Sequence, residues 1–184
     1  MKNLIGLFII VAALALACVV FFSSKSPATP ERPRTHEIPL SVYRGVNPGV
    51  ATEEDVIKTL GEPARKDVAP AGGALVYVSE VGDRPITVDL NTYKTVTKIV
   101  EPVGPQVRFS DVINNFGRAD LLLYGLLAKD GYILYVYPGR GAAFLANPVT
   151  LAVHQRWYFA PTDRAMFMAT LATGYFEQYD AGQQ

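Results

Sequence analysis

The chain opens with a long apolar run. Residues 4–22 contain no charged residue and no proline over nineteen positions. As a helix rising 1.5 Å per residue, this run would measure roughly 28 Å, close to the thickness of the hydrocarbon core of a bilayer. We therefore predict that residues 1–24 form a membrane anchor or signal segment, with residues 4–22 in contact with the membrane.

Three interpretations of this segment remain open. An uncleaved anchor fits its length, whereas the apolar core of a cleaved secretory signal is usually shorter, about 7–15 residues. A lipoprotein signal is the third, because residues 15–18 read Ala-Leu-Ala-Cys and resemble a lipobox. The candidate lipidation residue is Cys18. In the other two interpretations Cys18 carries no lipid and is a small apolar residue in a lipid-facing helix.

The charges around the apolar run bear on its orientation. Lys2 precedes the run, and three basic residues follow it within the next twelve positions. A count of Lys and Arg alone would keep the folded part inside. A single span at the extreme N-terminus is instead typical of a signal-anchor, so we expect the rest of the chain to be extracytoplasmic.

A proline-rich linker follows, for which we assign residues 25–44. Its four prolines are separated by polar residues, a composition that cannot build a core and favours extended polyproline II. The proline-containing stretch 23–39, sixteen or so residues at about 3 Å each, would hold a folded domain up to roughly 50 Å from the membrane.

Residues 53–60 have the pattern of a short amphipathic helix. Thr52 is a good N-cap, and Asp55 three positions later imitates a capping box. Gly61 suits a positive φ at the C-terminal end, and Pro63 prevents continuation. One apolar stripe is formed by Val56, Ile57 and Leu60.

This pattern occurs twice. Asp111 and Gly117 stand 56 positions after Asp55 and Gly61 (111 − 55 and 117 − 61), and an apolar stripe again ends at the glycine. The second copy has Arg108 where the first has its threonine cap, so Ser110 is the candidate N-cap there. A period of this length is typical of a repeated supersecondary unit.

Strand-like runs separated by turn residues follow each predicted helix, three in each copy. Residues 121–128 fit either a strand or a helix, and residues 162–174 predict a final helix capped by Thr162. The predicted strands are 74–78, 86–90 and 95–100 in the first copy, and 132–137, 142–145 and 154–159 in the second.

The fold class predicted from these elements is α+β. It consists of two tandem units, each a helix plus a three-stranded antiparallel sheet, packed as one domain after the N-terminal segment. The predicted boundaries are 45–103 for the first unit, 104–161 for the second, and 162–184 for a C-terminal helix and tail.

Charge and cysteine content narrow the function. Seventeen basic and seventeen acidic residues cancel, so the basic footprint of a nucleic-acid-binding protein is absent. The single cysteine, Cys18, lies in the apolar run, so the predicted domain has no disulfide and no thiolate ligand. With one histidine in that domain, His154, we expect no metal site and no cofactor.

Residues 49–63, followed by the tyrosine-containing strand at 76–78, resemble the SmpA/OmlA (BamE) lipoprotein family. The shared features are a glycine, a threonine-capped helix and a Leu-Gly-x-Pro ending. The tandem pair also resembles the fold of the β-lactamase inhibitor protein. The resemblance implies a short helical layer on an antiparallel sheet, and a binding or assembly role at an envelope membrane rather than catalysis.

No catalytic pattern stands out in the sequence. A Gly-x-Ser-x-Gly elbow is absent, and His154 begins a predicted strand. Residues 138–142 read Pro-Gly-Arg-Gly-Ala, which lacks the Lys-Ser/Thr of a phosphate-binding loop and fits a hairpin turn better. We therefore expect that the protein is not an enzyme.

A cluster of aromatic residues and one arginine is the best candidate for an interaction site. These residue types dominate interface hot spots. Strand alternation puts Tyr135 and Tyr137 on one face of a strand. That face is either an open, partner-binding side of the sheet or the core beneath a helix. The candidate partner-binding residues are Tyr135, Tyr137, Arg156 and Trp157.

The function predicted from the sequence is a membrane-anchored, extracytoplasmic, non-enzymatic module for protein binding or envelope assembly. The alternative is a small-ligand or lipid-binding sensor with a pocket between helices and sheet. Its expected partners are the membrane, through residues 4–22, and a protein; no nucleic acid is expected.

Overall fold

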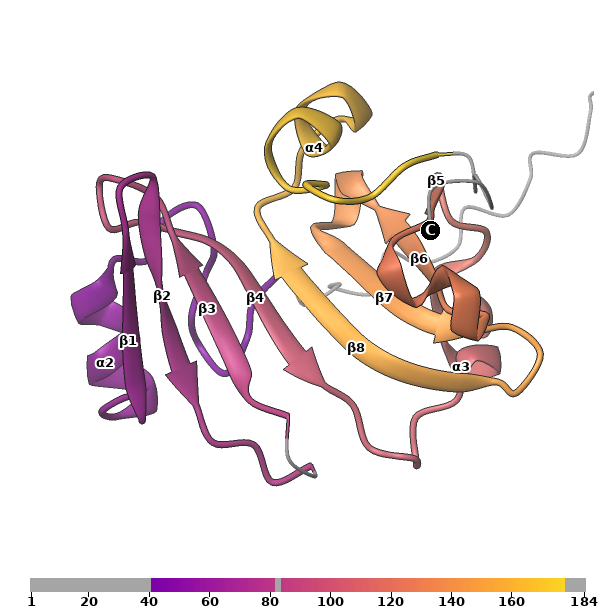
Figure 1. The fold of residues 1–184 in the computed structure, drawn as a ribbon, viewed down its shortest axis with the longest axis horizontal. Coiled ribbons are helices and arrows are strands. Elements are labelled where there is room, and N and C mark those ends of the chain that lie inside the picture. The colour runs from indigo at the N-terminus through magenta and orange to yellow at the C-terminus, as the bar shows by residue number, and fades with distance from the viewer. Residues whose placement is uncertain (1–40, 82–83, 178–184) are drawn as a thin grey trace, which may run out of the picture. The chain divides into compact units, whose positions relative to one another are not determined.

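A computed structural model describes residues 41–81 and 84–177 (Figure 1). The predicted anchor at residues 4–22, Cys18 and most of the proline-rich linker lie outside the described residues. Within the described ranges, no helix combines the length and the apolar character that crossing a bilayer requires.

Eight strands form one antiparallel sheet in the order β1-β2-β3-β4-β8-β7-β6-β5. Two connections contain short 3-10 turns, η1 (Leu126–Asp130) and η2 (Pro138–Arg140). The helices are α2 (Glu53–Leu60), α3 (Phe109–Phe116) and α4 (Arg164–Thr170). The strands are β1 (Arg65–Ala69), β2 (Gly72–Tyr77), β3 (Ile86–Leu90), β4 (Val96–Pro102), β5 (Leu121–Leu123), β6 (Ile133–Tyr137), β7 (Ala142–Asn147) and β8 (Ala152–Phe159).

The predicted fold class is wrong in its central feature. Two helix units, each with its own three-stranded sheet, are not found, because β4 pairs with β8 and joins all strands into one sheet. Val100 faces Trp157 across this seam, and Glu101 faces Arg156. Below, β1–β4 are called the first half of the sheet and β5–β8 the second half.

Each half contains an outer strand that the predicted three-stranded sheets did not include: β1 was not predicted, and β5 lies in residues 121–128, which fitted either a strand or a helix. Every residue of β1 is exposed. Its sequence, Arg-Lys-Asp-Val-Ala, shows no alternation of apolar and polar residues. β5 has only three residues, all leucine. Both lie at the edges of the sheet, where pairing on one side is enough to hold a strand that its own composition would not specify.

The helix α2 forms as predicted. The Thr52 hydroxyl accepts a hydrogen bond from the backbone N–H of Asp55 at 3.3 Å, and the Asp55 carboxylate accepts one from the backbone N–H of Thr52 at 2.9 Å. This capping box satisfies N–H groups that have no partner within the helix. Gly61 ends the helix with φ +87°, a region that favours glycine.

The helix α3 begins earlier than predicted. Its N-cap is Arg108, not Ser110. The backbone N–H of Phe109 donates to the carbonyl oxygen of Leu151 at 3.0 Å, and Arg108 forms an isolated bridge with Ala152. Backbone pairing with the turn before β8 therefore replaces the side-chain cap that the sequence suggested at Ser110.

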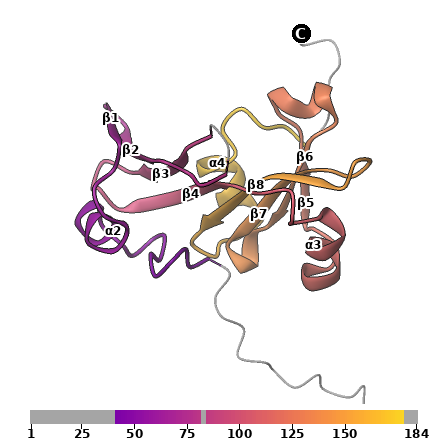
Figure 2. The ribbon, with the colours of Figure 1, turned by 90° about the horizontal axis from the view of Figure 1, so that it is seen from below.

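The helices lie on different sides of the sheet (Figure 2). Buried residues of α2 and α3, such as Val56 and Phe109, pack on one face, here called the helix-covered face. Phe167 of α4 packs on the opposite face, against Trp157 and Phe159 of β8. As a result, α4 covers the opposite face only over the second half of the sheet.

Candidate protein-binding face

The first half of the sheet has one side on which no helix of the described residues packs. Figure 1 shows α2 behind the β1 end of this half and no helix in front of β1–β4. Side chains alternate between the two sides of a strand, so the strand register identifies the residues on this side. We call this surface the open face; its residues are Arg65, Asp67, Ala74, Val76, Thr87, Asp89, Lys98 and Val100.

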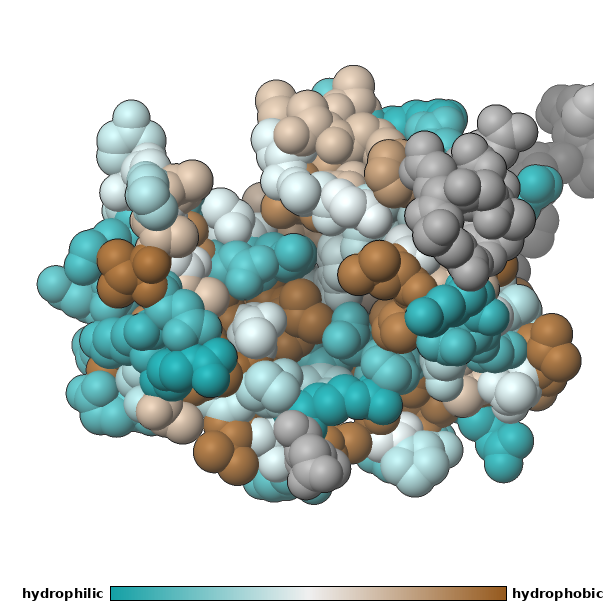
Figure 3. All heavy atoms as spheres, viewed as in Figure 1, coloured by the Kyte–Doolittle hydropathy of each residue, from teal (hydrophilic) through white to brown (hydrophobic). Residues whose placement is uncertain are grey.

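The open face is built from two cross-strand rows that continue into the second half. One row runs from Arg65 to Val100 and reaches Trp157 on β8; the other runs from Asp67 to Lys98 and reaches Phe159. In the space-filling view, hydrophilic and hydrophobic residues are interspersed over this side (Figure 3).

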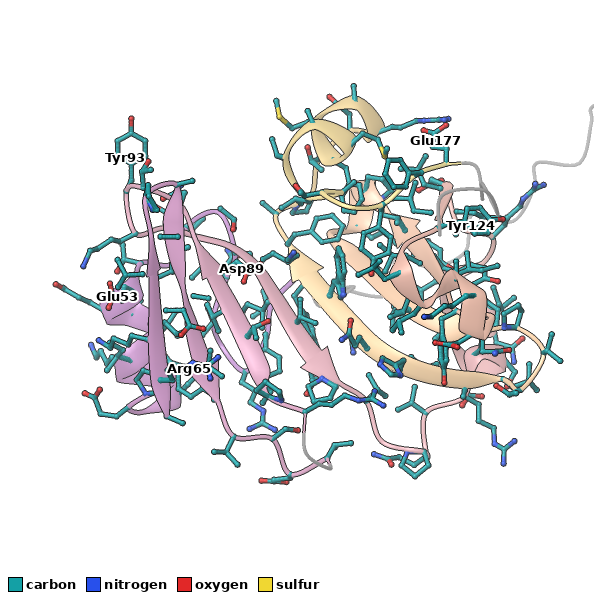
Figure 4. The ribbon with its side chains drawn as sticks, viewed as in Figure 1. Glu53, Arg65, Asp89, Tyr93, Tyr124 and Glu177 are labelled. Carbon is teal, nitrogen blue, oxygen red and sulfur yellow. The ribbon has the colours of Figure 1, made fainter. Side chains whose placement is uncertain are left out.

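Charges on the open face are paired. The Arg65 guanidinium lies 2.7 Å from the Asp67 carboxylate, and the Lys98 ammonium lies 3.1 Å from that of Asp89. Figure 4 labels Arg65 and Asp89 on this half of the sheet. The hydrogen bond from Arg65 to Asp67 also raises the pKa of the arginine. These two cations and two anions leave the open face without net charge, so it lacks the positive potential that attracts a polyanion.

Lys98 links the open face to the second half of the sheet. Its ammonium lies 4.5 Å from the centre of the Trp157 ring, within the range of a cation–π interaction. Trp157 is only 4% exposed, and Tyr175 packs against its edge at 5.4 Å. The predicted partner-binding residue Trp157 is therefore a core side chain that borders the open face.

Tyr135 and Tyr137 occupy the helix-covered face beneath α3. Tyr137 is 2% exposed, and its hydroxyl donates to the carbonyl oxygen of Gly117 at 2.9 Å. The ring of Tyr135 lies 4.2 Å from that of Phe109. Burial raises the pKa of both phenols. Of the two arrangements considered above, the structure therefore has the core beneath a helix. Tyr135 and Tyr137 do not form an aromatic row on an open side of the sheet.

Arg156 lies on the same face as these tyrosines, not with Trp157. Its guanidinium carbon lies 4.5 Å from the centre of the Tyr158 ring and 5.5 Å from that of Phe144. Its Nε is buried and has no hydrogen-bond partner in the described part of the chain. The neighbouring carboxylate of Glu101 instead accepts a hydrogen bond from the Tyr158 hydroxyl at 2.7 Å.

The four predicted residues therefore do not form one site. Tyr135, Tyr137 and Arg156 point to the helix-covered face, and Trp157 points to the other. The half-buried positions Thr87 and Asp89 were missed, although the strict alternation of β3 already marked one side of that strand as polar.

A groove is present at the far edge of the second half. It has a volume of about 350 Å³ and is open to solvent. It lies between α3 and the edge strand β5, and so is not the interior pocket between helices and sheet that a sensor would need. The lining residues are Ile113, Arg118, Ala119, Asp120, Leu122 and Tyr135.

His154 lies near an aromatic ring and a cation. The centres of the His154 and Tyr132 rings lie 4.9 Å apart, with the rings tilted at 59° to each other. Burial, followed by the charge of Arg84, lowers the pKa of the imidazole. Among residues 41–81 and 84–177, no three His, Cys, Asp or Glu side chains come together as metal ligands would.

Comparison with known proteins leaves the family open. No protein-family model matches the chain, and no curated protein matches it. Two solved structures are similar: a DUF4309 family protein (YjgB) from Bacillus subtilis, with 17% identity, a TM-score of 0.48 and coverage of 63% of this chain and 83% of that one; and an extracellular protein containing an SCP domain from Bacillus anthracis, with 12% identity, a TM-score of 0.48 and coverage of 83% of this chain and 55% of that one.

Proposed function

We propose that the protein is a membrane-anchored, extracytoplasmic, non-enzymatic module that binds another protein through the open face of β1–β4. One observation carries the proposal: this side of the sheet has mixed apolar and charged side chains, no net charge, and no helix of the described residues on it. The apolar segment at residues 4–22 supports the membrane anchor.

The area of the open face limits how large an interface it can form by itself. Four strands spaced about 4.8 Å apart, each contributing about five residues at about 3.3 Å, cover roughly 320 Å². A standard interface buries about 800 Å² on each partner. A partner must therefore also contact the exposed Val78 and Tyr93, which lie at opposite ends of the strands, or bind weakly.

Photo-cross-linking from the open face tests the proposal. A benzoylphenylalanine replaces Thr87, which lies on the open face, in the full chain in native membranes. A matched chain carries it at Thr59, an exposed position on α2 on the other side of the sheet. We expect one protein adduct that forms from position 87 and not from 59. Equal adducts from both positions, or none from position 87, would refute the function.

The alternative, a small-ligand or lipid-binding sensor, requires a pocket and not an open sheet face. An enclosed apolar pocket of several hundred Å³ would favour it. The groove beside β5 is open and has a charged residue of each sign in its lining, so it suits a polypeptide better than a lipid or a small apolar molecule.

A further inference from the structure

The two outer strands of the sheet differ in how their edges are protected. Lys66 of β1 pairs with Leu75 of β2, and Leu122 of β5 pairs with Tyr135 of β6. Lys66 and Leu122 thus occupy equivalent positions in the two halves of the sheet, each on an edge strand that follows a helix.

β1 has the features that prevent edge-to-edge pairing. It reads Arg-Lys-Asp-Val-Ala, and the Lys66 ammonium lies 3.1 Å from the carboxylate of Glu53 on α2. Charged side chains, lysine above all, are a common protection of exposed strand edges. β5 reads Leu-Leu-Leu and has no such charge, and Leu122 is 42% exposed.

The backbone at the outer side of β5 is oriented for pairing. The N–H of Tyr124 donates to the carbonyl oxygen of Phe176 at 2.7 Å, and the N–H of Phe176 donates back at 2.9 Å. In antiparallel strands, residues two positions apart direct their backbone groups to the same side. Leu122 therefore presents its N–H and C=O outward, beside that short bridge, and no other strand of the described residues pairs with it there.

The groove beside this edge fits side chains of an added strand. Leu122 and the partly exposed Ile113 provide apolar walls, and Tyr135 also lines the groove. Arg118 and Asp120 supply one positive and one negative charge. A volume of about 350 Å³ accommodates apolar side chains from alternate positions of an extended segment.

We propose that the outer edge of β5 at Leu122, which is unpaired among the described residues, accepts an extended segment of a partner protein as an added antiparallel strand. The segment places an apolar side chain against Leu122 and Ile113. Charge complementarity requires a basic residue facing Asp120 and an acidic one facing Arg118. Because Asp120 and Arg118 precede β5 in the chain, an antiparallel segment carries these charged residues after its apolar residue. Backbone pairing supplies affinity and the groove supplies specificity.

A second copy of the chain fits this edge less well. Two β5 strands paired antiparallel about Leu122 would bring Asp120 opposite Tyr124, whose backbone already pairs with Phe176. The charges of Arg118 and Asp120 would then meet no opposite charge. The edge therefore favours a different polypeptide over self-association.

Peptide binding tests this inference with the full chain in detergent micelles. The probe is a fluorescein-labelled peptide, Thr-Leu-Thr-Lys-Thr-Glu-Thr, followed by fluorescence polarisation. We expect binding that falls at least tenfold in Leu122→Lys, which copies the protection found in β1. The matched control Leu126→Lys removes another exposed leucine, 92% exposed and outside the groove, and should bind like the wild type. Equal binding by Leu122→Lys and the wild type would overturn the proposal.

Two further measurements test whether the peptide binds by backbone pairing and whether the edge instead binds a second copy of the chain. A peptide N-methylated at alternate residues, which cannot pair through its backbone, should not bind; unchanged binding would show that no strand is added. Sedimentation velocity should give the same oligomeric state for wild type and Leu122→Lys; a wild-type dimer lost in the variant would assign the edge to a second copy and overturn the proposal.

The chain's own C-terminus provides the last comparison. A chain ending at Glu177 should bind the peptide with the same affinity as the full chain. Binding by the shortened chain alone would assign the edge to residues 178–184 and refute the partner proposal. This surface lies at the opposite end of the sheet from β1, so its test is independent of the cross-link from Thr87.

Discussion

The hydroxyl of Tyr137 donates a hydrogen bond to the carbonyl oxygen of Gly117, the residue that ends α3. Tyr77 makes the same bond to Gly61, which ends α2, with lengths of 2.9 and 3.1 Å in the two cases. In each half, the last residue of a central strand thus satisfies a carbonyl at a helix C-terminus, a group that has no partner within the helix.

Removing this hydrogen bond should destabilise the fold. Tyr137→Phe keeps the buried ring but leaves the Gly117 carbonyl without its partner, which costs about 1–2 kcal/mol of unfolding free energy. We expect Tyr77→Phe to cost about as much. Thermal unfolding measures the effect, and Tyr93→Phe serves as the control because Tyr93 is exposed. A midpoint for Tyr137→Phe equal to that of the control would contradict the prediction.

Lys98 should contribute to stability more than an ordinary surface lysine. It is mostly buried, lies over the Trp157 ring and pairs with Asp89. Lys98→Met retains most of the aliphatic stem and removes both charge interactions, so we expect a loss of about 1 kcal/mol. Urea unfolding provides the measurement.

The matched control for Lys98 is Lys94→Met. Lys94 also forms an ion pair, with Glu53 at 3.0 Å, but its side chain is exposed. Exposed pairs of this kind contribute about 0–1 kcal/mol. Equal losses in the two variants would show that stacking on Trp157 adds nothing.

Stability should fall at alkaline pH through buried tyrosines. Burial, and then the charge of Glu101, raises the pKa of Tyr43 from 10.0 to about 12. The folded state therefore holds this proton more tightly than the unfolded state. The resulting stability is fully present below pH 10 and is lost as the pH rises from about 10 to about 12.

Urea unfolding between pH 8 and 11 tests this dependence. Tyr43→Phe should make the decline with pH shallower, because one of the proton-retaining groups is gone. Part of the slope should remain, since burial also raises the pKa of Tyr158. The Tyr43 hydroxyl has no hydrogen-bond partner among the described residues, so the variant should be about as stable as the wild type at pH 7. An unchanged alkaline slope would rule out this role of Tyr43.

The lipoprotein interpretation of the N-terminal segment makes its own prediction. If a lipid is attached at Cys18, Cys18→Ser should abolish incorporation of labelled palmitate, because the thiol is the attachment site. Ser24→Ala, six positions further on, should leave labelling unchanged. Equal labelling of the wild type and Cys18→Ser would exclude lipidation at this residue.

Local patterns predicted the helices and the central strands. The capping residues of α2 and the alternation of β3 act within a few positions, so they can be read from the chain directly. β1 could not be recognised in this way, because its charged residues serve to protect an edge and carry no apolar alternation. β5 is too short for any periodicity to show.

The candidate site depended on long-range relationships that the sequence does not display. Alternation placed Tyr135 and Tyr137 on one side of β6 but could not say that α3 covers that side. Arg156 and Trp157 are neighbours in sequence and therefore face opposite sides of β8. Phe167 of α4 packs over Phe159 in the second half, and no helix of the described residues packs on that side of β1–β4.

The pairing of β4 with β8 also has a kinetic consequence. It joins residues about sixty positions apart, such as Lys98 and Phe159, so it closes late and slowly compared with the hairpins on either side. Until it closes, each half exposes an inner strand rich in valine, isoleucine and aromatic residues, with unpaired backbone groups along its length. Such strands are templates for aggregation. The β4–β8 pairing, which lies in the middle of the finished sheet, is therefore the part of this fold at which aggregation threatens while the chain is still folding.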